Sequence, residues 1–105
     1  MSKINVSYVY QGDITEPEKE IITSTVDFNI DGKMSEYIHK LKKDDATKLD
    51  LKVTIEKNKK RLFNGSFVLS ASGGDTLRYA REDFNQLTDL VNHAFDHFKE
   101  ALASK

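Results

Sequence analysis

The sequence predicts an α+β fold in the element order strand, helix-forming region, three antiparallel strands, helix. Apolar residues alternate with polar ones near the start of the chain and again from residue 49. Two turn signals divide this second region into strands, and an apolar stripe with helical spacing follows it. At 105 residues the chain has the length of a single domain, residues 1–105, with one core.

The first strand begins at Ile4, where four apolar residues alternate with polar ones until Gly12 and Asp13 mark a turn. A helix start follows: Thr15 can cap the free backbone N–H groups and Glu18 can return the hydrogen bond. Pro17 in the first turn loses no helical hydrogen bond. These signals predict a helix that begins near residue 16.

The continuation of this helix to residue 30 is ambiguous. Apolar residues at positions 22, 26 and 30 have helical spacing, whereas positions 22, 24, 26, 28 and 30 alternate as a strand would. The β-branched residues of 21–26 favour the strand. An extra strand at 21–30, giving β-β-α-β-β-β-α, is therefore an alternative. A short amphipathic helix is predicted from Lys33 to Lys43 in both cases.

The second half of the chain predicts a three-stranded meander closed by a helix. Residues 49–56 alternate cleanly, residues 58–60 fit a hairpin tip, and residues 62–71 form the return strand, with a bulge at Asn64-Gly65. Residues 73–75 form a second turn into a strand at 76–81. From Phe84 to Ala101 apolar residues recur at intervals of three and four, which indicates a helix that covers one face of a sheet.

Composition narrows the classes of function. The chain has no cysteine, which excludes disulfides, thiolate metal sites and cysteine nucleophiles. It has no apolar run of the length of a signal peptide or a membrane span, so we expect a cytoplasmic protein without a membrane partner. The net charge is only −1, but residues 33–43 carry four bases against one acid and residues 48–61 carry six against two. Acidic stretches lie at residues 13–31 and from residue 82 onward. Binding of nucleic acid would therefore depend on local charge.

Six segments in this order resemble the ribosome hibernation-promoting factor family, also known as ribosome-associated inhibitor or sigma-54 modulation proteins. They are KINVS (3–7), DITE (13–16), SEYIHKLKK (35–43), VTIEKNKKR (53–61), LRYARED (77–83) and QLTDLVNHAFDHFKEAL (86–102). The resemblance covers nearly the whole chain and is weakest at residues 21–32. The chain resembles a short form of the family, because the dimerising tail of the long members has no counterpart in the sequence.

The resemblance implies a β-α-β-β-β-α fold with two helices packed on one face of a four-stranded sheet. It favours the helix over the strand at residues 21–30. It also implies a translation regulator in ribosome hibernation and the stress response, which binds the decoding region of the small ribosomal subunit, where mRNA and tRNA would otherwise lie. The family's helices commonly offer bases to rRNA, whereas the last helix here presents Asp89, Asp96 and Glu100.

Together, the charge pattern and the resemblance predict a set of rRNA contacts, because cations at a hairpin tip and on neighbouring elements can neutralise phosphates. The predicted RNA-binding residues are Lys40, Lys42, Lys43, Lys57, Lys59, Lys60, Arg61, Arg78 and Arg81. A hairpin tip that only solubilises the protein is the simpler interpretation of such a charge run. Tyr37 and Tyr79 could stack on bases, although aromatic residues in this pattern more often belong to a core.

Other chemistry has little support in the sequence. His93 and His97 have the spacing of a divalent metal site, but surface histidines near acids are common and we predict no metal. No catalytic motif is present, so we expect neither an enzyme nor a cofactor or small-molecule substrate. The alternative to a ribosome-binding regulator is a small protein-interaction module of the same fold, with the acidic last helix as its partner surface.

Overall fold

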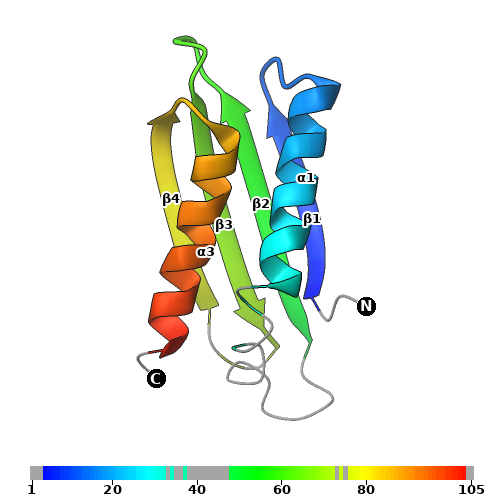
Figure 1. Cartoon of the computed structure of the whole chain (residues 1–105), viewed down its shortest axis with the longest axis vertical. Helices are drawn as coiled ribbons and strands as arrows, with labels where there is room; N and C mark the ends of the chain where they lie inside the picture. The colour runs from blue at the N-terminus through cyan, green and yellow to red at the C-terminus, as the bar shows by residue number, and fades with distance from the viewer. Residues whose placement is uncertain are drawn as a thin grey trace.

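The computed structural model of the chain describes residues 4–32, 34, 37, 48–72, 74 and 76–103. Its elements follow the predicted order β-α-β-β-β-α (Figure 1). They are β1 (Ile4–Gln11), α1 (Glu16–Asp31), β2 (Leu49–Lys57), β3 (Phe63–Ala71), β4 (Thr76–Phe84) and α3 (Leu87–Ala103). The predicted α+β fold class is thereby confirmed.

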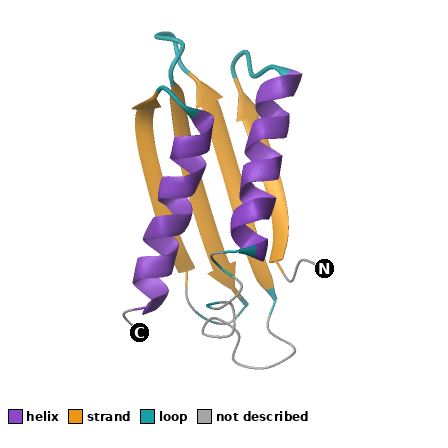
Figure 2. Ribbon diagram, viewed as in Figure 1, coloured by secondary structure: helices purple, strands orange, loops and turns teal. Residues whose placement is uncertain are grey.

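The four strands form one mixed sheet in the order β1-β2-β3-β4. β1 is parallel to β2, with Ile4 opposite Leu49, and the two later pairs are antiparallel. A parallel pair needs a long crossover connection, and α1 lies within it. Both helices cover the same face of the sheet (Figure 2), so its other face, which we call the outer face, has no helix over it in the described part of the chain.

Residues 16–31 are helical, and the alternative of an extra strand at 21–30 is wrong. The capping box is complete: Glu18 N donates to Thr15 Oγ1 at 3.3 Å, and Thr15 N donates to Glu18 Oε1 at 2.9 Å. The apolar residues at helical spacing are buried, while Phe28, which a strand would have buried with them, is 76% exposed. Of the helix predicted at 33–43, only the buried Met34 and the partly buried Tyr37 lie within the described residues.

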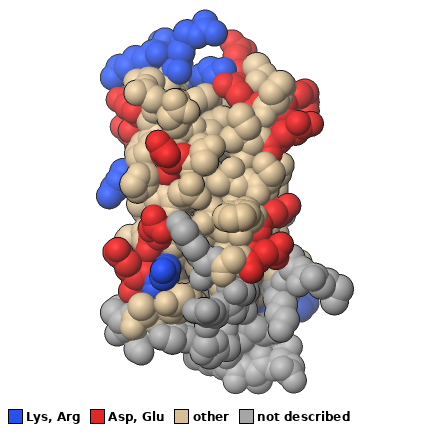
Figure 3. Space-filling model, viewed as in Figure 1, with Lys and Arg blue, Asp and Glu red and all other residues tan. Residues whose placement is uncertain are grey.

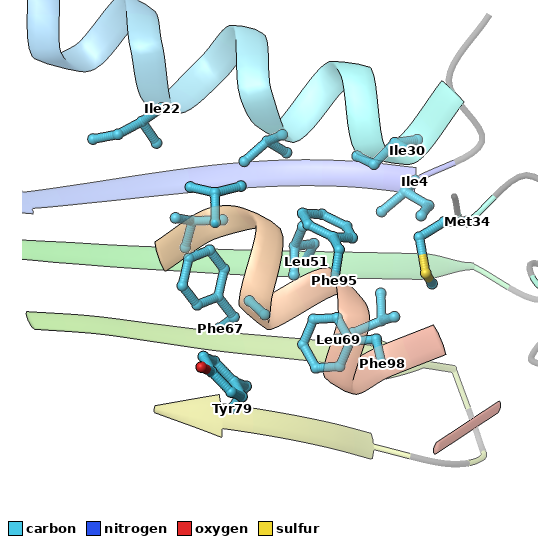
Figure 4. Packing of buried hydrophobic residues seen from close by; sticks show 14 of the residues in the cluster. Ile4, Ile22, Ile30, Met34, Leu51, Phe67, Leu69, Tyr79, Phe95 and Phe98 are labelled. Carbon is cyan, nitrogen blue, oxygen red and sulfur yellow. The ribbon is translucent and has the colours of Figure 1, made fainter. Parts of the chain in front are cut away.

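The core lies between the sheet and the two helices (Figure 4). Alternate residues of β2 and β3, such as Leu51 and Phe67, are fully buried against the helices. The Phe95 and Phe98 rings of α3 meet edge to face, with centroids 6.0 Å apart. Tyr79 of β4 is part of this core, as the more common interpretation of such an aromatic residue predicts.

β4 continues three residues beyond the predicted end at Arg81. Gly65 pairs with Arg81 but Phe63 pairs with Phe84, so β4 has one residue more than β3 at this point. The irregularity is where the sequence predicts a bulge, but the additional residue belongs to β4 and not to Asn64-Gly65. Asp83, within this bulge, has a positive φ of 59°.

Candidate nucleic-acid interface

The turn between β2 and β3 exposes a group of basic side chains. Hydrogen bonds to Asn58 hold the backbone of this turn. Asn58 Oδ1 accepts hydrogen bonds from the backbone N–H groups of Lys60 at 2.9 Å and Leu62 at 3.1 Å. The Asn58 carbonyl accepts a third, from Arg61 N at 3.0 Å. The backbone N–H groups of residues 60–62 are therefore satisfied within the turn, and the side chains of residues 59–61 are exposed to solvent. They form the basic end of the molecule in Figure 3.

The hairpin tip, defined as residues 58–62, is tied to β4 through the bulge. Asn58 Nδ2 donates to Asp83 Oδ1 at 2.7 Å and to Asn64 Oδ1 at 3.1 Å. Asn64 Nδ2 donates in turn to Glu56 Oε1 at 2.9 Å, and Asp83 N donates to Asn64 Oδ1 at 3.1 Å. These bonds connect the ends of β2, β3 and β4, so the tip is held against the sheet.

The three bases of the tip differ in their partners. Lys60 Nζ lies 3.2 Å from Asp83 Oδ2, an exposed ion pair of the kind that contributes little to stability. Neither Lys59 nor Arg61 pairs with a carboxylate within the ranges that the structure describes. Arg61 has a φ of 65°, which turns the chain back into β3. Lys59 and Arg61 are the cations most available to an anion.

A shallow hollow of about 320 Å³ lies between the tip and the turn that joins β1 to α1. Lys59 and Arg61 line one side of it, and Gly12 and Asp13 line the other. Gly12 has a φ of 77°, and a Cβ there would lie 2.5 Å from the Lys57 carbonyl oxygen. The turn therefore packs closely on the end of β2, and the hollow beside the two cations has room for a phosphate group.

Lys57, also predicted to bind RNA, lies in a different environment. Its Nζ is 2.8 Å from Glu18 Oε1, and the two side chains are only 12% and 21% exposed. The ammonium group also lies 5.6 Å from the centroid of the Phe63 ring. The ion pair joins the end of β2 to the start of α1, so the geometry gives Lys57 a structural role.

The contact with Lys57 affects the pKa of the Glu18 carboxyl group. Burial by itself raises its pKa, but hydrogen bonds from Lys57 and Thr15 to the charged form have the opposite effect. The net result is a pKa below the ordinary value for glutamate.

Arg78 and Arg81 of β4 point to opposite faces of the sheet. Arg78 lines a hollow of about 430 Å³ on the outer face, together with Lys52, Asp50 and several small polar residues. The Arg81 guanidinium lies 5.0 Å from the centroid of the Tyr79 ring, which belongs to the helix-covered face. The structure therefore does not bring these two arginines together.

Lys52 and Asn58 belong to these surfaces but were not among the residues predicted to bind RNA. Lys52 shares the outer face with Arg78, which the alternation of residues 49–56 could have shown. The role of Asn58 depends on contacts across the turn and to β4, for which the sequence gives no signal. The predicted contacts Lys40, Lys42 and Lys43 lie outside the described residues.

The polar side of α3 carries acids and two packed histidines. The His93 ring lies edge-on to Phe84 at 5.7 Å, and the His97 ring lies 5.3 Å from Tyr79. Over the described ranges, histidine, aspartate and glutamate do not gather into a group of three that could hold a metal ion. No helix found there is long and apolar enough to cross a membrane.

The structure thus has the fold of a four-stranded mixed sheet with two helices on one face and a cationic hairpin tip at one end. Among solved structures, the N-terminal domain of Thermus thermophilus Protein Y is similar, with a TM-score of 0.60. The match covers 93% of this chain and 94% of that chain at 15% sequence identity, so it shows a shared fold. No family model matches the sequence, and no curated protein sequence is significantly similar to it.

Proposed function

We propose that this chain is a non-enzymatic translation regulator that binds the small ribosomal subunit at the mRNA and tRNA sites and stabilises inactive ribosomes. The sequence resemblance to the hibernation-promoting family supports the proposal, because the fold that it implies is the fold observed. The likeness to the Protein Y domain supports it at the level of the fold.

The observation that carries the proposal is the cationic hairpin tip. Lys59 and Arg61 are exposed, have no carboxylate partner among the residues described, and flank a hollow that could take a phosphate. Each phosphate that they neutralise releases condensed counterions, which gives an affinity that falls steeply with salt. The anchoring of the tip through Asn58 and Asp83 reduces the entropy lost when RNA binds.

The charge distribution also supports one orientation of the protein on RNA. α1 and α3 together carry eight acids and two lysines, so the helix-covered side repels phosphates. The tip is the described surface that attracts them, whereas Lys52 and Arg78 on the outer face share their hollow with Asp50. The proposed mechanism is steric: contacts at the tip anchor the domain, and its body occupies space that mRNA and tRNA would need.

Charge reversal at the tip tests the proposal by cosedimentation with purified small subunits. For Lys59→Glu and Arg61→Glu together, we expect binding at about 50 mM salt to weaken by at least tenfold, because two phosphate contacts are lost and replaced by repulsion. Each single variant should lower the slope of log affinity against log salt by about one. Lys99→Glu, an exposed residue of α3 with the same charge change, should bind like the unaltered protein.

Two results would contradict the proposal. If the unaltered chain does not sediment with the small subunit even at low salt, the chain is not a ribosome-binding protein. If it does sediment but the double reversal at the tip binds equally well, the chain contacts the ribosome through another surface.

A further inference from the structure

A second surface, separate from the hairpin tip, lies along the solvent side of α1. Ile21 and Phe28 are 41% and 76% exposed, whereas Ile22, Val26 and Ile30 of the same helix are buried. Ile21 and Phe28 are seven residues apart and therefore lie on one side of the helix, two turns from each other. The small residues Ser24 and Thr25 lie between them.

Phe28 borders a hollow of about 250 Å³ between the two helices. Ser24 and Thr25 of α1 line it on one side, and Thr88 and Asn92 of α3 line it on the other. All four are small or medium-sized and uncharged, so the hollow can accept one apolar side chain with Phe28 against it. We call the hollow, Phe28 and Ile21 the helix groove.

Asn29 fixes the spacing of the two helices beneath the helix groove. It is 1% exposed, and its Nδ2 donates to Asn92 Oδ1 at 2.9 Å and to the Thr25 carbonyl at 2.8 Å. Its Oδ1 has no hydrogen-bond partner among the residues described. A buried polar contact of this kind is costly to break, so the helix groove is a preformed feature of the fold.

The fold itself does not need an exposed phenylalanine at this position. Phe28 is not part of the core, and phenylalanine has a lower helix propensity than alanine, glutamate or lysine. Large aromatic side chains that are exposed beside a hollow are typical of binding surfaces.

Acidic residues lie beside the helix groove. On α1, Glu20 precedes Ile21, Asp27 precedes Phe28 and Asp31 follows it, and on α3 Asp89 follows Thr88. None of the four makes an ion pair with another described residue. Figure 3, which looks onto the helices, shows an uncharged area between them with acids along the α1 side.

We propose that the helix groove binds a basic protein segment that inserts one apolar side chain into the hollow beside Phe28. Lysines or arginines flanking that side chain would pair with Glu20, Asp27 and Asp31. The same acids exclude other occupants: nucleic acid would be repelled, and a second copy placed groove to groove would bring two acidic surfaces together.

The test uses labelled peptides of twelve residues as probes. The first has arginines around one central leucine, the second has serine in place of the leucine, and the third has glutamates in place of the arginines. We expect the first to bind most tightly by fluorescence anisotropy and to shift the backbone amide resonances of residues 24–28 and 88–92. The second and third should each bind at least tenfold more weakly.

Substitutions in the chain locate the contact. Phe28→Ser should weaken binding of the first peptide by at least tenfold, and its circular dichroism and melting temperature should be unchanged because the side chain is exposed. Val9→Ser, which also replaces an exposed apolar residue but on the outer face, should bind normally. Thr88→Trp, which fills the hollow, is a second variant that should block binding.

Three outcomes would overturn the proposal: equal binding by Phe28→Ser, equal binding of the serine peptide, and shifts confined to residues 59–61. A concentration-dependent dimer that Phe28→Ser abolishes would also overturn it, because the occupant would then be a second copy. Cosedimentation of Phe28→Ser with small subunits separates this proposal from the one for the tip, because that variant should retain normal ribosome binding.

Discussion

Lys57 and Lys59 are two residues apart in the same hairpin, but they differ in what surrounds them. The Lys57 side chain is 12% exposed and pairs with Glu18, whereas Lys59 lies in the turn and is exposed. An ion pair shielded from water is screened less by salt than an exposed one. Removal of one partner leaves the other charge shielded from water and without a counter-charge, which is costly. Two bases that look equivalent in the sequence therefore have different consequences when they are replaced.

Glu18→Gln tests the ion pair through pH. Because the pKa of Glu18 is lowered in the folded state, its carboxylate stabilises the fold above the unfolded pKa of 4.5, and this stability is lost as the pH falls through the folded-state pKa. At neutral pH we expect the variant to lose about 1–2 kcal/mol in free energy of unfolding. Urea denaturation should show that the difference from the unaltered protein shrinks as the pH falls below 4.5.

The matched control is Glu16→Gln, in the same turn of α1. Glu16 is 83% exposed and pairs with Lys19 at 3.3 Å, so its replacement should change the free energy of unfolding by less than about 1 kcal/mol. A loss for Glu18→Gln that stays constant down to low pH would show that the charge of Glu18 does not stabilise the fold.

At the scale of elements, Gly65 sets how closely α3 approaches β3. A Cβ at this position would lie 2.8 Å from Leu90 Cδ2 and 3.1 Å from Leu90 Cγ, and Leu90 is fully buried. Glycine is otherwise unfavourable in a strand, so the close contact with the helix explains its presence.

Gly65→Ala should therefore destabilise the protein. Overpacking costs about 1–3 kcal/mol, which exceeds the gain of about 0.5–1 kcal/mol from replacing glycine in a strand. In a Leu90→Ala background the clash disappears, so the two substitutions together should cost less than the sum of the separate losses by at least about 0.5 kcal/mol. Denaturant unfolding of the four proteins measures this coupling. Ser66→Ala, exposed on the outer face, is the control, and additive losses would rule out the contact.

Local patterns in the sequence predicted the four strands and the last helix, but they left residues 21–30 open between helix and strand and did not give every bound. Both periods fitted residues 16–30, and both bury Ile22 and Val26. The helix is distinguished by the capping box at Thr15, the exposure of Phe28 and the burial of Asn29. The extension of β4 to Phe84 depends on a bulge in which Asp83 takes a positive φ. Aspartate tolerates that conformation, but nothing in its neighbours requires it.

The candidate site was predictable in its location and less so in its details. The run of bases at residues 57–61 located the tip, because charge and turn signals are local. The partner of Lys57 is 39 residues away in the sequence, and the partner of Lys60 is 23 residues away. Such contacts arise only when the sheet and α1 assemble, so only the structure separates paired from available cations.

At the scale of the whole molecule, the two helices differ in charge from the other elements. α1 and α3 carry eight acids and two lysines, whereas the other residues that the structure describes carry eight bases and five acids. The net charge of −1 therefore conceals a separation of charge within the described part of the molecule. Such a separation orients the protein as it approaches a polyanion and keeps the helix-covered side turned away.

Reversing the charge of two acidic residues of α1 tests whether the helix-covered side faces away from RNA. Asp27→Lys with Asp31→Lys removes part of the repulsion on the helix side, so we expect affinity for poly(U), an RNA without defined structure, to rise about three- to tenfold at about 50 mM salt. Most of the gain should disappear at about 300 mM, where exposed charges are screened over shorter distances. Affinity for the small subunit should change less, because binding through the tip keeps these positions away from rRNA. Filter binding measures the affinity for poly(U), and cosedimentation measures the affinity for the small subunit. If the two affinities rise equally, the helices face the ribosome and the orientation proposed from the charges is wrong.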